Sequence, residues 1–277
     1  MSARRRDDVE ALEIDLLVQA LYEAYGFDFR QYSRPSLRRR IWRRVDAEGL
    51  VTVTGLLERV LHDQRAVQRL ISDLSVSVSA MFRDPTFFAV FRKKVVPLLR
   101  TYPFIRIWNA GCSTGEEAYS LAILIREAGL YDRTRIYATD MNEAALDQAR
   151  AGSFPIAKMR DYTANYIEAG GTHSFSEYYA AAGDRVVFER SLSENVVFAQ
   201  HNLVTDRSFN DFQVILCRNV MIYFDRQLQA RVHDLLYESL VNFGILGLGI
   251  RESLSFTAHA DHYERLDEDQ QLYRKVR

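Results

Sequence analysis

The chain has 277 residues, 48% of them hydrophobic, which is enough for one large domain or for a large domain plus a small one. No apolar run approaches the roughly 20 residues of a membrane span, and the basic N-terminus lacks the apolar stretch of a secretory signal. Residues 1–100 carry 18 Lys and Arg against 13 Asp and Glu, and residues 101–277 carry 18 against 24, so the net charge of −1 hides a basic and an acidic part that we expect to do different jobs.

The cysteines and histidines indicate a reducing compartment and no metal. Cys112 and Cys217 each adjoin the end of an expected strand, so we expect buried, reduced thiols in a cytosolic protein. The six histidines lack the paired spacing of zinc ligands, and no metal site is expected.

Residues 10–75 show helical periodicity with few glycines or prolines, which predicts a small all-helical domain over residues 1–75. Helices are expected over about 36–49, 52–62 and 66–74. The helix before them is expected to gather one apolar face from Leu12, Leu16, Leu17, Ala20 and Leu21.

The helix over 36–49 is rich in arginine. Leu37, Ile41 and Val45 form a stripe that can pack inward. That packing would leave on the outer faces Arg38, Arg39, Arg40, Arg43 and Arg44. A solvated helix face is one interpretation, and nucleic-acid contact is a second, because arginines suit phosphate. The near-neutral net charge and the small basic clusters elsewhere argue against nucleic acid.

Residues 76–103 connect this domain to the next. Val76–Ala80 is expected to be extended, and Asp84 followed by Pro85 is typical of a helix start, with Asp84 as N-cap of a helix over 86–100.

From residue 104 strands and helices alternate, which predicts an α/β domain with a doubly wound parallel sheet. Strands are expected at 104–109, 135–139, 196–200, 212–217 and 244–250, and helices at 116–128, 142–151 and 226–241. A hairpin of about 263–266 with 271–276 closes the chain and can add an antiparallel strand. Residues 152–195 interrupt the alternation and are expected to form an inserted lid or small sheet.

The small-residue turn over 110–115, between the first strand and its helix, is typical of a nucleotide-sized site. Glycines let the backbone approach a ligand, and the helix that begins at Glu116 points free N–H groups at it. The next strand ends in Asp140, which is placed to take two ribose hydroxyls. The turn is not GxGxxG and lacks the P-loop lysine, so it favours a nucleoside over a pyrophosphate.

A second cluster follows the strand over 212–217. Arg218, Asn219 and Tyr223 are expected at the carboxyl edge of the sheet, where open α/β folds bind ligands. Asn219 as a helix cap and Tyr223 as a core aromatic are the alternative.

Four segments in order, MFRDPTFF, AGCSTGEEAYSLA, TDMNEAALDQARAGSF and CRNVMIYFD, resemble the chemotaxis receptor methyltransferase family, the CheR-type protein-glutamate O-methyltransferases. The resemblance covers almost the whole chain. It implies a class I S-adenosylmethionine-dependent methyltransferase domain with a Rossmann-like sheet over residues 104–277, preceded by the helical domain and by a linker and connecting helix over 76–103.

The resemblance also implies roles for single residues. Arg83 and Tyr223 resemble the family's active-site arginine and tyrosine. The positions that resemble cofactor-lining residues are Ser77, Ser79, Arg83, Ala110, Glu116, Asp140, Asn202, Leu203, Arg218 and Asn219. Ser77 and Ser79 depart from the family's NETxFFR, with serines for asparagine and threonine. GIRESLSF departs from GHSExL. Arg83 as a mere helix cap and Tyr223 as mere core remain the structural alternatives.

The implied function is transfer of a methyl group from S-adenosylmethionine, which leaves S-adenosylhomocysteine, to glutamate carboxylates of chemoreceptors. The resemblance favours docking of the arginine-rich helix on the acidic helices of a receptor's cytoplasmic domain. We expect a cytoplasmic monomer with no nucleic-acid partner and no direct membrane insertion. The alternatives are a class I methyltransferase for another protein or a small molecule, and a cofactor-binding regulatory module without turnover.

Overall fold

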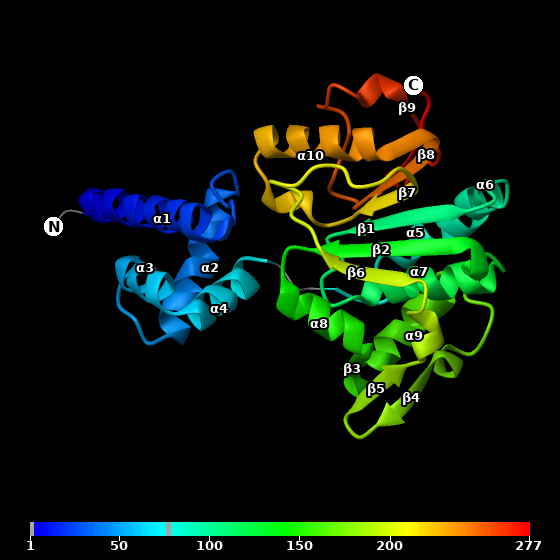
Figure 1. Cartoon of the computed structure of the whole chain (residues 1–277), viewed down its shortest axis with the longest axis horizontal. Helices are drawn as coiled ribbons and strands as arrows, with labels where there is room; N and C mark the ends of the chain where they lie inside the picture. Colours follow the sequence, from blue (N-terminus) through cyan, green and yellow to red (C-terminus); the bar gives the residue numbers. More distant parts are fainter. Residues whose placement is uncertain (1–2, 76–78) are drawn as a thin grey trace. The chain divides into compact units, whose positions relative to one another are not determined.

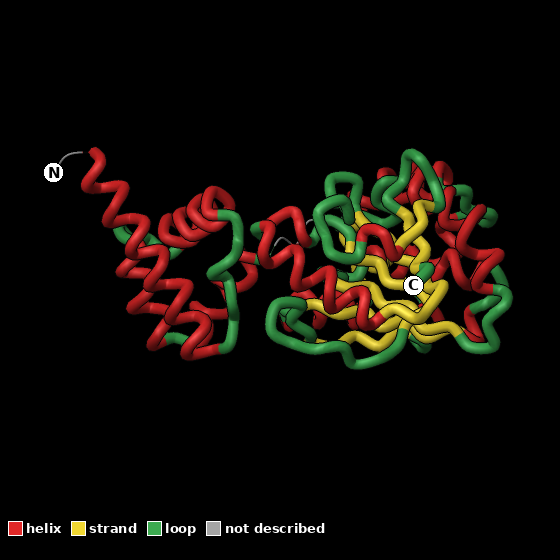
Figure 2. Tube along the Cα trace, turned by 90° about the horizontal axis from the view of Figure 1, so that it is seen from above, coloured by secondary structure: helices red, strands yellow, loops and turns green. Residues whose placement is uncertain are grey.

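The structure, a computed structural model, describes residues 3–75 and 79–277 and divides them into two units. One unit holds residues 3–75 together with Tyr223–Arg231, and the other holds the remaining residues. Every strand of the described chain belongs to the second unit, as Figure 2 shows by colour. Ser77, which the sequence places at the cofactor, lies outside the described residues, and so do its two neighbours at positions 76 and 78.

The predicted all-helical character of the first unit is confirmed. Its helices are α1 (Ala3–Tyr25), α2 (Arg34–Ala47), α3 (Val53–His62) and α4 (Gln64–Leu74), labelled in Figure 1. Thr52 caps α3, with its hydroxyl accepting the N–H of Gly55 at 3.0 Å. Tyr223–Arg231 belongs to this unit because the carbonyl of Tyr223 accepts the N–H of Ser33 at 2.8 Å.

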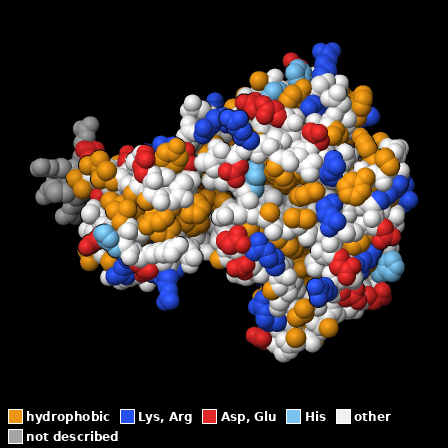
Figure 3. All heavy atoms as spheres, viewed as in Figure 1, with side chains coloured by type: hydrophobic (Ala, Val, Ile, Leu, Met, Phe, Trp, Pro, Cys, Tyr) orange, Lys and Arg blue, Asp and Glu red, His pale blue; other side chains and the backbone are white. Residues whose placement is uncertain are grey.

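The buried face of α1 differs from the prediction. Leu17 and Leu21 are fully buried as expected, but Leu12 is 58% exposed and Leu16 is 50% exposed. The inward stripe follows i, i+3, i+4, i+7 and consists of Ile14, Leu17, Val18 and Leu21. Leu12 precedes that stripe by two positions, about 200° around the helix, so it faces outward. Figure 3 shows hydrophobic side chains gathering on the visible surface of this unit.

Seven strands form the main sheet of the second unit, in the order β6-β2-β1-β7-β8-β10-β9. They are β1 (Ile105–Ala110), β2 (Thr134–Asp140), β6 (Val196–Gln200), β7 (Phe212–Cys217), β8 (Leu240–Leu248), β9 (Tyr263–Arg265) and β10 (Leu272–Lys275). Neighbours from β6 to β8 are parallel, and β10 is antiparallel to β8 and β9. The predicted doubly wound sheet with a terminal antiparallel hairpin is confirmed. The strand order reverses between β1 and β7, where such sheets open a crevice for ligands.

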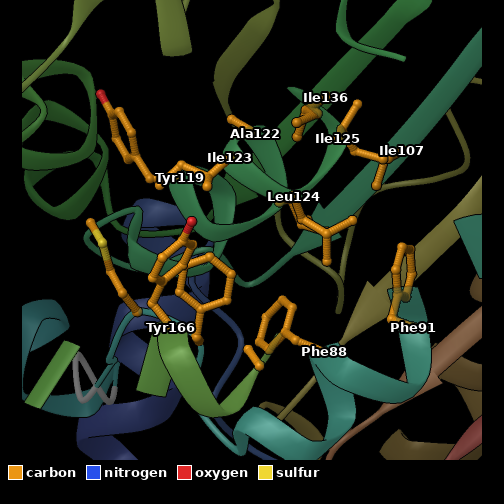
Figure 4. Packing of buried hydrophobic residues seen from close by; sticks show 14 of the residues in the cluster. Phe88, Phe91, Ile107, Tyr119, Ala122, Ile123, Leu124, Ile125, Ile136 and Tyr166 are labelled. Carbon is orange, nitrogen blue, oxygen red and sulfur yellow. The ribbon is translucent and has the colours of Figure 1, made fainter. Parts of the chain in front are cut away.

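The core of this unit is built around α7. Its helices include α7 (Glu116–Glu127), α8 (Glu143–Ala151) and the part of α10 (Arg226–Ser239) from Val232 on. Short helical turns are η2 (Tyr131–Arg133), η5 (Arg190–Leu192), η7 (Ala260–His262) and η6 (Met221–Tyr223), whose last residue belongs to the helical unit. Ile123, Leu124 and Ile125 are all fully buried, so α7 is apolar on several sides, as a helix inside a core must be. Figure 4 shows them packed with Phe88 and with Ile107 of β1.

The connecting helix begins one residue earlier than expected and is not uniform. It consists of α5 (Pro85–Val90), a π-helical turn (Phe91–Val95) and α6 (Val96–Leu99). Pro97 has no N–H for Lys93, and the π turn accommodates it by bonding the N–H of Val96 to the carbonyl of Phe91. The predicted N-cap position of Asp84, with Pro85 after it, is confirmed, but the Asp84 side chain makes no capping bond and its carboxylate pairs with Arg218 at 2.8 Å instead.

The segment that interrupts the alternation forms a small sheet with its own helices. Three strands pair antiparallel in the order β3 (Ser153–Pro155), β5 (Arg185–Phe188) and β4 (Tyr179–Ala182). The same segment contains α9 (Met159–Glu168), which Figure 1 labels with the three strands, and the short turns η3 (Ile156–Lys158) and η4 (Phe175–Tyr178). Glu127, at the end of α7, anchors this part by accepting hydrogen bonds from the hydroxyls of Tyr166 and Tyr178 and by pairing with Arg92. No helix in the described chain is both long and apolar enough to cross a membrane.

Candidate cofactor and active site

The turn between β1 and α7 has a fixed backbone shape. Gly111 (φ +76°), Ser113 (φ +51°) and Gly115 (φ +95°) all take the left-handed region. The N–H of Gly111 donates to the carbonyl of Thr139 at 2.8 Å, which fastens the turn to the end of β2. A Cβ on Gly111 would lie 2.4 Å from Cγ2 of Val220, so only glycine fits between the two turns.

Asp140 stands directly beside this turn. Its Oδ2 accepts the N–H of Ser113 at 2.9 Å, and its Oδ1 accepts the N–H of Asn142 at 3.0 Å. A carboxylate offers about four acceptor sites, so the group as a whole keeps capacity for a ligand hydroxyl. Burial raises the pKa of Asp140, against the lowering effect of the backbone hydrogen bonds. The structure thus holds a half-buried acid at the end of β2 through backbone hydrogen bonds.

Glu116 is buried at the first turn of α7, where the helix dipole favours an anion. Its Oε2 accepts from the hydroxyl of Thr114 at 2.6 Å, and its Oε1 accepts from Tyr162 at 3.2 Å, with the ammonium of Lys158 at 3.8 Å. Burial, followed by the charge of Glu116, raises the pKa of Tyr162 and keeps its hydroxyl a donor. The segment after β3 therefore contributes two polar groups that sequence reasoning missed.

The end of β6 leads into a compact turn. The N–H of His201 donates to the carbonyl of Asp140 at 3.1 Å. The side chain of Asn202 accepts the N–H of Val204 at 3.0 Å, which commits it to the turn, and Leu203 is half-buried. Ala110, at the end of β1, is buried. Asn202 and Leu203 thus follow the strand next to Asp140, and Ala110 ends the strand on its other side.

Arg218 is buried at the end of β7, and its guanidinium is engaged by the protein itself. Nη1 donates to Glu117 at 2.5 Å, and Nη2 donates to Asp84 at 2.8 Å and to the carbonyl of Arg83 at 3.0 Å. The guanidinium lies over the ring of Phe87, 4.0 Å from its centre. Glu117 in turn accepts from the side chain of Asn109 at 2.8 Å.

The turn after Arg218 is organised by Glu252, a residue that the sequence analysis did not single out. Its buried carboxylate accepts four backbone N–H groups at 2.7–2.9 Å, from Asn219, Val220, Met221 and Gly249. Burial raises the pKa of Glu252 and these hydrogen bonds lower it. Asn219 is left-handed (φ +61°) and lies two positions before Met221, where η6 begins, so it is a turn residue and not a helix cap. The sequence signal that could have identified Glu252 is the glutamate that GIRESLSF shares with the family's GHSExL.

Arg83 lies in an unusual backbone segment. Phe82 (φ +48°) and Asp84 (φ +57°) flank it, and both are non-glycine residues in the left-handed region. Phe82 is fully buried, and its N–H donates to the hydroxyl of Ser120 at 2.8 Å. Arg83 and Ser79 are each half-buried. Arg83 therefore lies just before α5, between two residues whose backbone takes the left-handed region.

Tyr223 belongs to the helical unit, whereas Arg83 belongs to the other unit. The guanidinium of Arg40 lies over the ring of Tyr223, 4.6 Å from its centre, and also donates to the carbonyl of Leu74. Arg40 is only 7% exposed, so its predicted place on an outer face of α2 is wrong. The reason is that the C-terminus of α4 and the ring of Tyr223 together offer partners for a buried guanidinium.

The other arginines of α2 are largely paired within the helical unit. Arg38 pairs with Glu10, and both Arg43 and Arg44 pair with Asp73. Arg44 also reaches Glu48 at 3.3 Å. The sequence analysis placed these arginines on outer faces and missed the acids Glu10 and Asp73, which α1 and α4 bring to the helix. Arg39 is exposed, and the side chain of Arg43 is 66% exposed despite its partner.

No group of three or more potential metal ligands occurs among residues 3–75 and 79–277. Cys112 and Cys217 are free and buried.

Two family models match the chain: "CheR methyltransferase, all-alpha domain" over residues 12–75 and "CheR methyltransferase, SAM binding domain" over residues 77–271. "Putative methyltransferase Cher3" of Pseudomonas putida is 48% identical over 99% of this chain and 100% of its own length. "Chemotaxis protein methyltransferase" of Listeria innocua is 29% identical over 83% of this chain and 85% of its own length. "Chemotaxis protein methyltransferase 2" of Pseudomonas aeruginosa is 29% identical over 89% and 87%.

Proposed function

The chain belongs to the CheR methyltransferase family, and from this premise we propose that it transfers methyl groups from S-adenosylmethionine to glutamate side chains of chemoreceptors. The observation that carries the proposal is the half-buried carboxylate of Asp140, which accepts the N–H of Ser113 in the glycine turn. The proposal places the reaction in the cytoplasm, on the helical domain of a receptor.

S-adenosylmethionine is the cofactor of the domain that matches residues 77–271, and the residues at the carboxyl edge fit it. Asp140 keeps acceptor capacity for ribose hydroxyls. The hydroxyl oxygen of Ser113 is buried without a hydrogen-bond partner in the described chain, as expected of a group that awaits a ligand. Glu116 supplies an anion for the amino group of the cofactor. Ala110, Asn202, Leu203 and Asn219 complete the proposed lining, with Ser79 and Ser77 before Arg83.

The bound cofactor supplies an electrophilic methyl group on a sulfonium sulfur. A glutamate side chain is ionised at neutral pH, since its ordinary pKa is about 4.3, so the chain needs no general base. Its residues bind and orient. We propose that Arg83 holds the acceptor carboxylate through its planar fork and that Tyr223 donates one further hydrogen bond. Ideal positioning can contribute roughly 7–11 kcal/mol to the lowering of the barrier.

Substrate docking is proposed for the exposed arginines of α2. Arg39 and Arg43 carry this part of the proposal, because Arg40 and most of Arg44 are buried and Arg38 is held by Glu10. An acidic receptor helix would compete with Asp73 for Arg43. Such surface charges mainly raise the encounter rate.

The proposal is tested by incubating the protein with methyl-labelled S-adenosylmethionine and cytoplasmic fragments of chemoreceptors. Base-labile label on a receptor fragment is expected, because carboxyl methyl esters hydrolyse in base. Base-stable label on another protein or a small molecule would support a different methyltransferase. Tight cofactor binding without transfer to any acceptor would support a regulatory module. The variant Asp140→Ala serves as the control for label that does not come from the enzyme.

A further inference from the structure

We propose that Arg218 is a positioning residue for Arg83. It fixes the backbone that carries the Arg83 side chain and does not itself contact cofactor or substrate. The inference rests on the proposed function, in which Arg83 orients the acceptor carboxylate, and it deepens that function. The resemblance assigned Arg218 to the cofactor, so the two roles lead to different expectations.

The backbone around Arg83 needs support. The left-handed φ angle at Phe82 is unfavourable for a residue other than glycine, whereas Asp84 tolerates that region more readily. Such strain persists only where the surroundings impose it, and it is typical of functional sites. Here two anchors impose it, one on each side of Arg83.

The first anchor is Phe82. Its ring is fully buried against the rings of Phe88 and Tyr166, with centroids 5.2 and 5.3 Å away. Its N–H donates to Ser120, whose hydroxyl donates to the carbonyl of Glu116 at 2.7 Å. This side of the segment is therefore tied to the first turns of α7.

The second anchor is Arg218. One guanidinium nitrogen, Nη2, holds both the carboxylate of Asp84 and the carbonyl of Arg83, at 2.8 and 3.0 Å. The other, Nη1, holds Glu117 in the first turn of α7. The side chain of Arg218 is 1% exposed, and the ring of Phe87 covers it. The Arg83 backbone is thus fixed relative to α7 and the end of β7 by a single buried cation.

The planar fork is what this position requires. A lysine has one nitrogen and cannot span Glu117, Asp84 and the Arg83 carbonyl in the same geometry. The Nε–H of Arg218 is buried and lacks an acceptor in the part of the chain that the structure describes. A cofactor contact through that group is the rival role, and affinity measurements detect it.

The test is a double-mutant cycle between Arg218→Lys and Arg83→Ala, read as kcat for methyl transfer and as the dissociation constant of S-adenosylhomocysteine. Arg218→Lys alone should lower kcat roughly tenfold or more, because a displacement of about 1 Å can cost on the order of 100-fold. In the Arg83→Ala background the same substitution should change neither quantity, since nothing is left to position. A loss of affinity in both backgrounds would show that Arg218 contacts the cofactor and would overturn the proposal.

Asp84→Asn provides a milder variant if Arg218→Lys folds poorly. Asparagine tolerates the left-handed region as aspartate does, and the carboxylate of Asp84 is 38% exposed, so the fold should survive. This variant should also lower kcat only when Arg83 is present. An equal loss of rate with and without Arg83 would contradict the proposal.

Amide hydrogen exchange over residues 82–88 tests positioning without turnover. Exchange there should be faster in Arg218→Lys and in Asp84→Asn than in the parent chain. If exchange is faster in the variants but the parent chain methylates no receptor, the proposed function is wrong and the positioning role of Arg218 is still supported. Unchanged exchange in both variants would sink the positioning role, even if receptor methylation is found.

Discussion

At the scale of single residues, Asp140 is a half-buried acid at the end of β2, and the proposed function assigns it to the cofactor. Burial raises its pKa while the backbone N–H groups of Asn142, Ser113 and Met141 stabilise the charged form. Hydrogen bonds to a charged group contribute about 1.5–3 kcal/mol each. A ligand that bonds to this carboxylate therefore gains substantially from it.

Asp140→Ala should weaken binding of S-adenosylmethionine about tenfold or more, because about 1.4 kcal/mol corresponds to one factor of ten. Titration calorimetry measures the affinity, and circular dichroism verifies the fold. Asp147→Ala, which removes an exposed acid of α8, is the matched control and should bind as the parent does. Equal affinities for all three proteins would remove Asp140 from the site.

Glu252 acts on the same site from the next turn. Glu252→Gln exchanges one acceptor oxygen for an NH₂ group that must face backbone donors, and unmet buried donors cost about 1–3 kcal/mol. The turn with Val220 should shift, and because Val220 packs on Gly111 the cofactor affinity should fall together with the melting temperature. A melting curve and a titration that both match the parent would show that these four hydrogen bonds do not hold the turn.

At the scale of elements, Glu48 ties three helices together. It follows α2 and pairs with Arg69 of α4 and Arg59 of α3 as well as with Arg44 of α2. These partners, Arg69 first, lower the pKa of Glu48 to about 2 from its ordinary 4.5. A lowered carboxyl pKa contributes stability above the ordinary pKa that is lost as the pH falls through the lowered one.

The helical unit should therefore lose stability between pH 4.5 and about 2 through this residue. Glu48→Gln should melt at a lower temperature than the parent at pH 7, and the difference should shrink on acidification. Thermal melts by circular dichroism at several pH values measure this, with Glu58→Gln, an exposed position of α3, as control. A difference in melting temperature that stays constant with pH would mean that the ion pairs of Glu48 contribute nothing.

The proposed docking surface belongs to one helix. Arg39→Ala combined with Arg43→Ala should raise the apparent KM for a receptor fragment and leave the cofactor affinity unchanged. Salt should slow the parent more than this variant, because the screening length is about 8 Å at physiological ionic strength. Arg65→Ala with Arg190→Ala removes the same charge from exposed positions elsewhere and should behave as the parent. If methylation depends on salt in the same way in all three proteins, the arginines of α2 form a solvated face and do not bind the receptor.

The sequence predicted most elements because their patterns are local. A buried apolar run such as that of β7, followed by a helical repeat, signals one strand and one helix without knowledge of the rest. Asp84 shows the limit of this reasoning. Aspartate before proline is a good local cap, but its carboxylate pairs with Arg218, 134 residues along the chain, and the distant partner wins.

At the scale of the whole molecule, the sequence predicted which residues lie at the carboxyl edge of the sheet. It did not predict the hydrogen bonds and ion pairs that these residues make with one another. Parallel strands bring their ends to one edge, so Asp140 and Arg218 were expected there. Two carboxylates bind Arg218, and Glu252 holds the turn after it. These contacts depend on loops that meet only in the folded chain, so the sequence could not predict them. The ion pairs of the arginine-rich helix were not predicted for the same reason, because Glu10 and Asp73 approach it from other helices.

The most direct test of the central claim is to locate the transferred methyl group on a chemoreceptor fragment by mass spectrometry. The account predicts methyl esters on glutamate side chains of the helical cytoplasmic domain, formed by the parent chain and strongly reduced with Asp140→Ala when S-adenosylmethionine is below saturation. Methylation confined to lysine, arginine or another non-carboxyl group would contradict it, and so would an ester signal that persists undiminished in the Asp140→Ala variant.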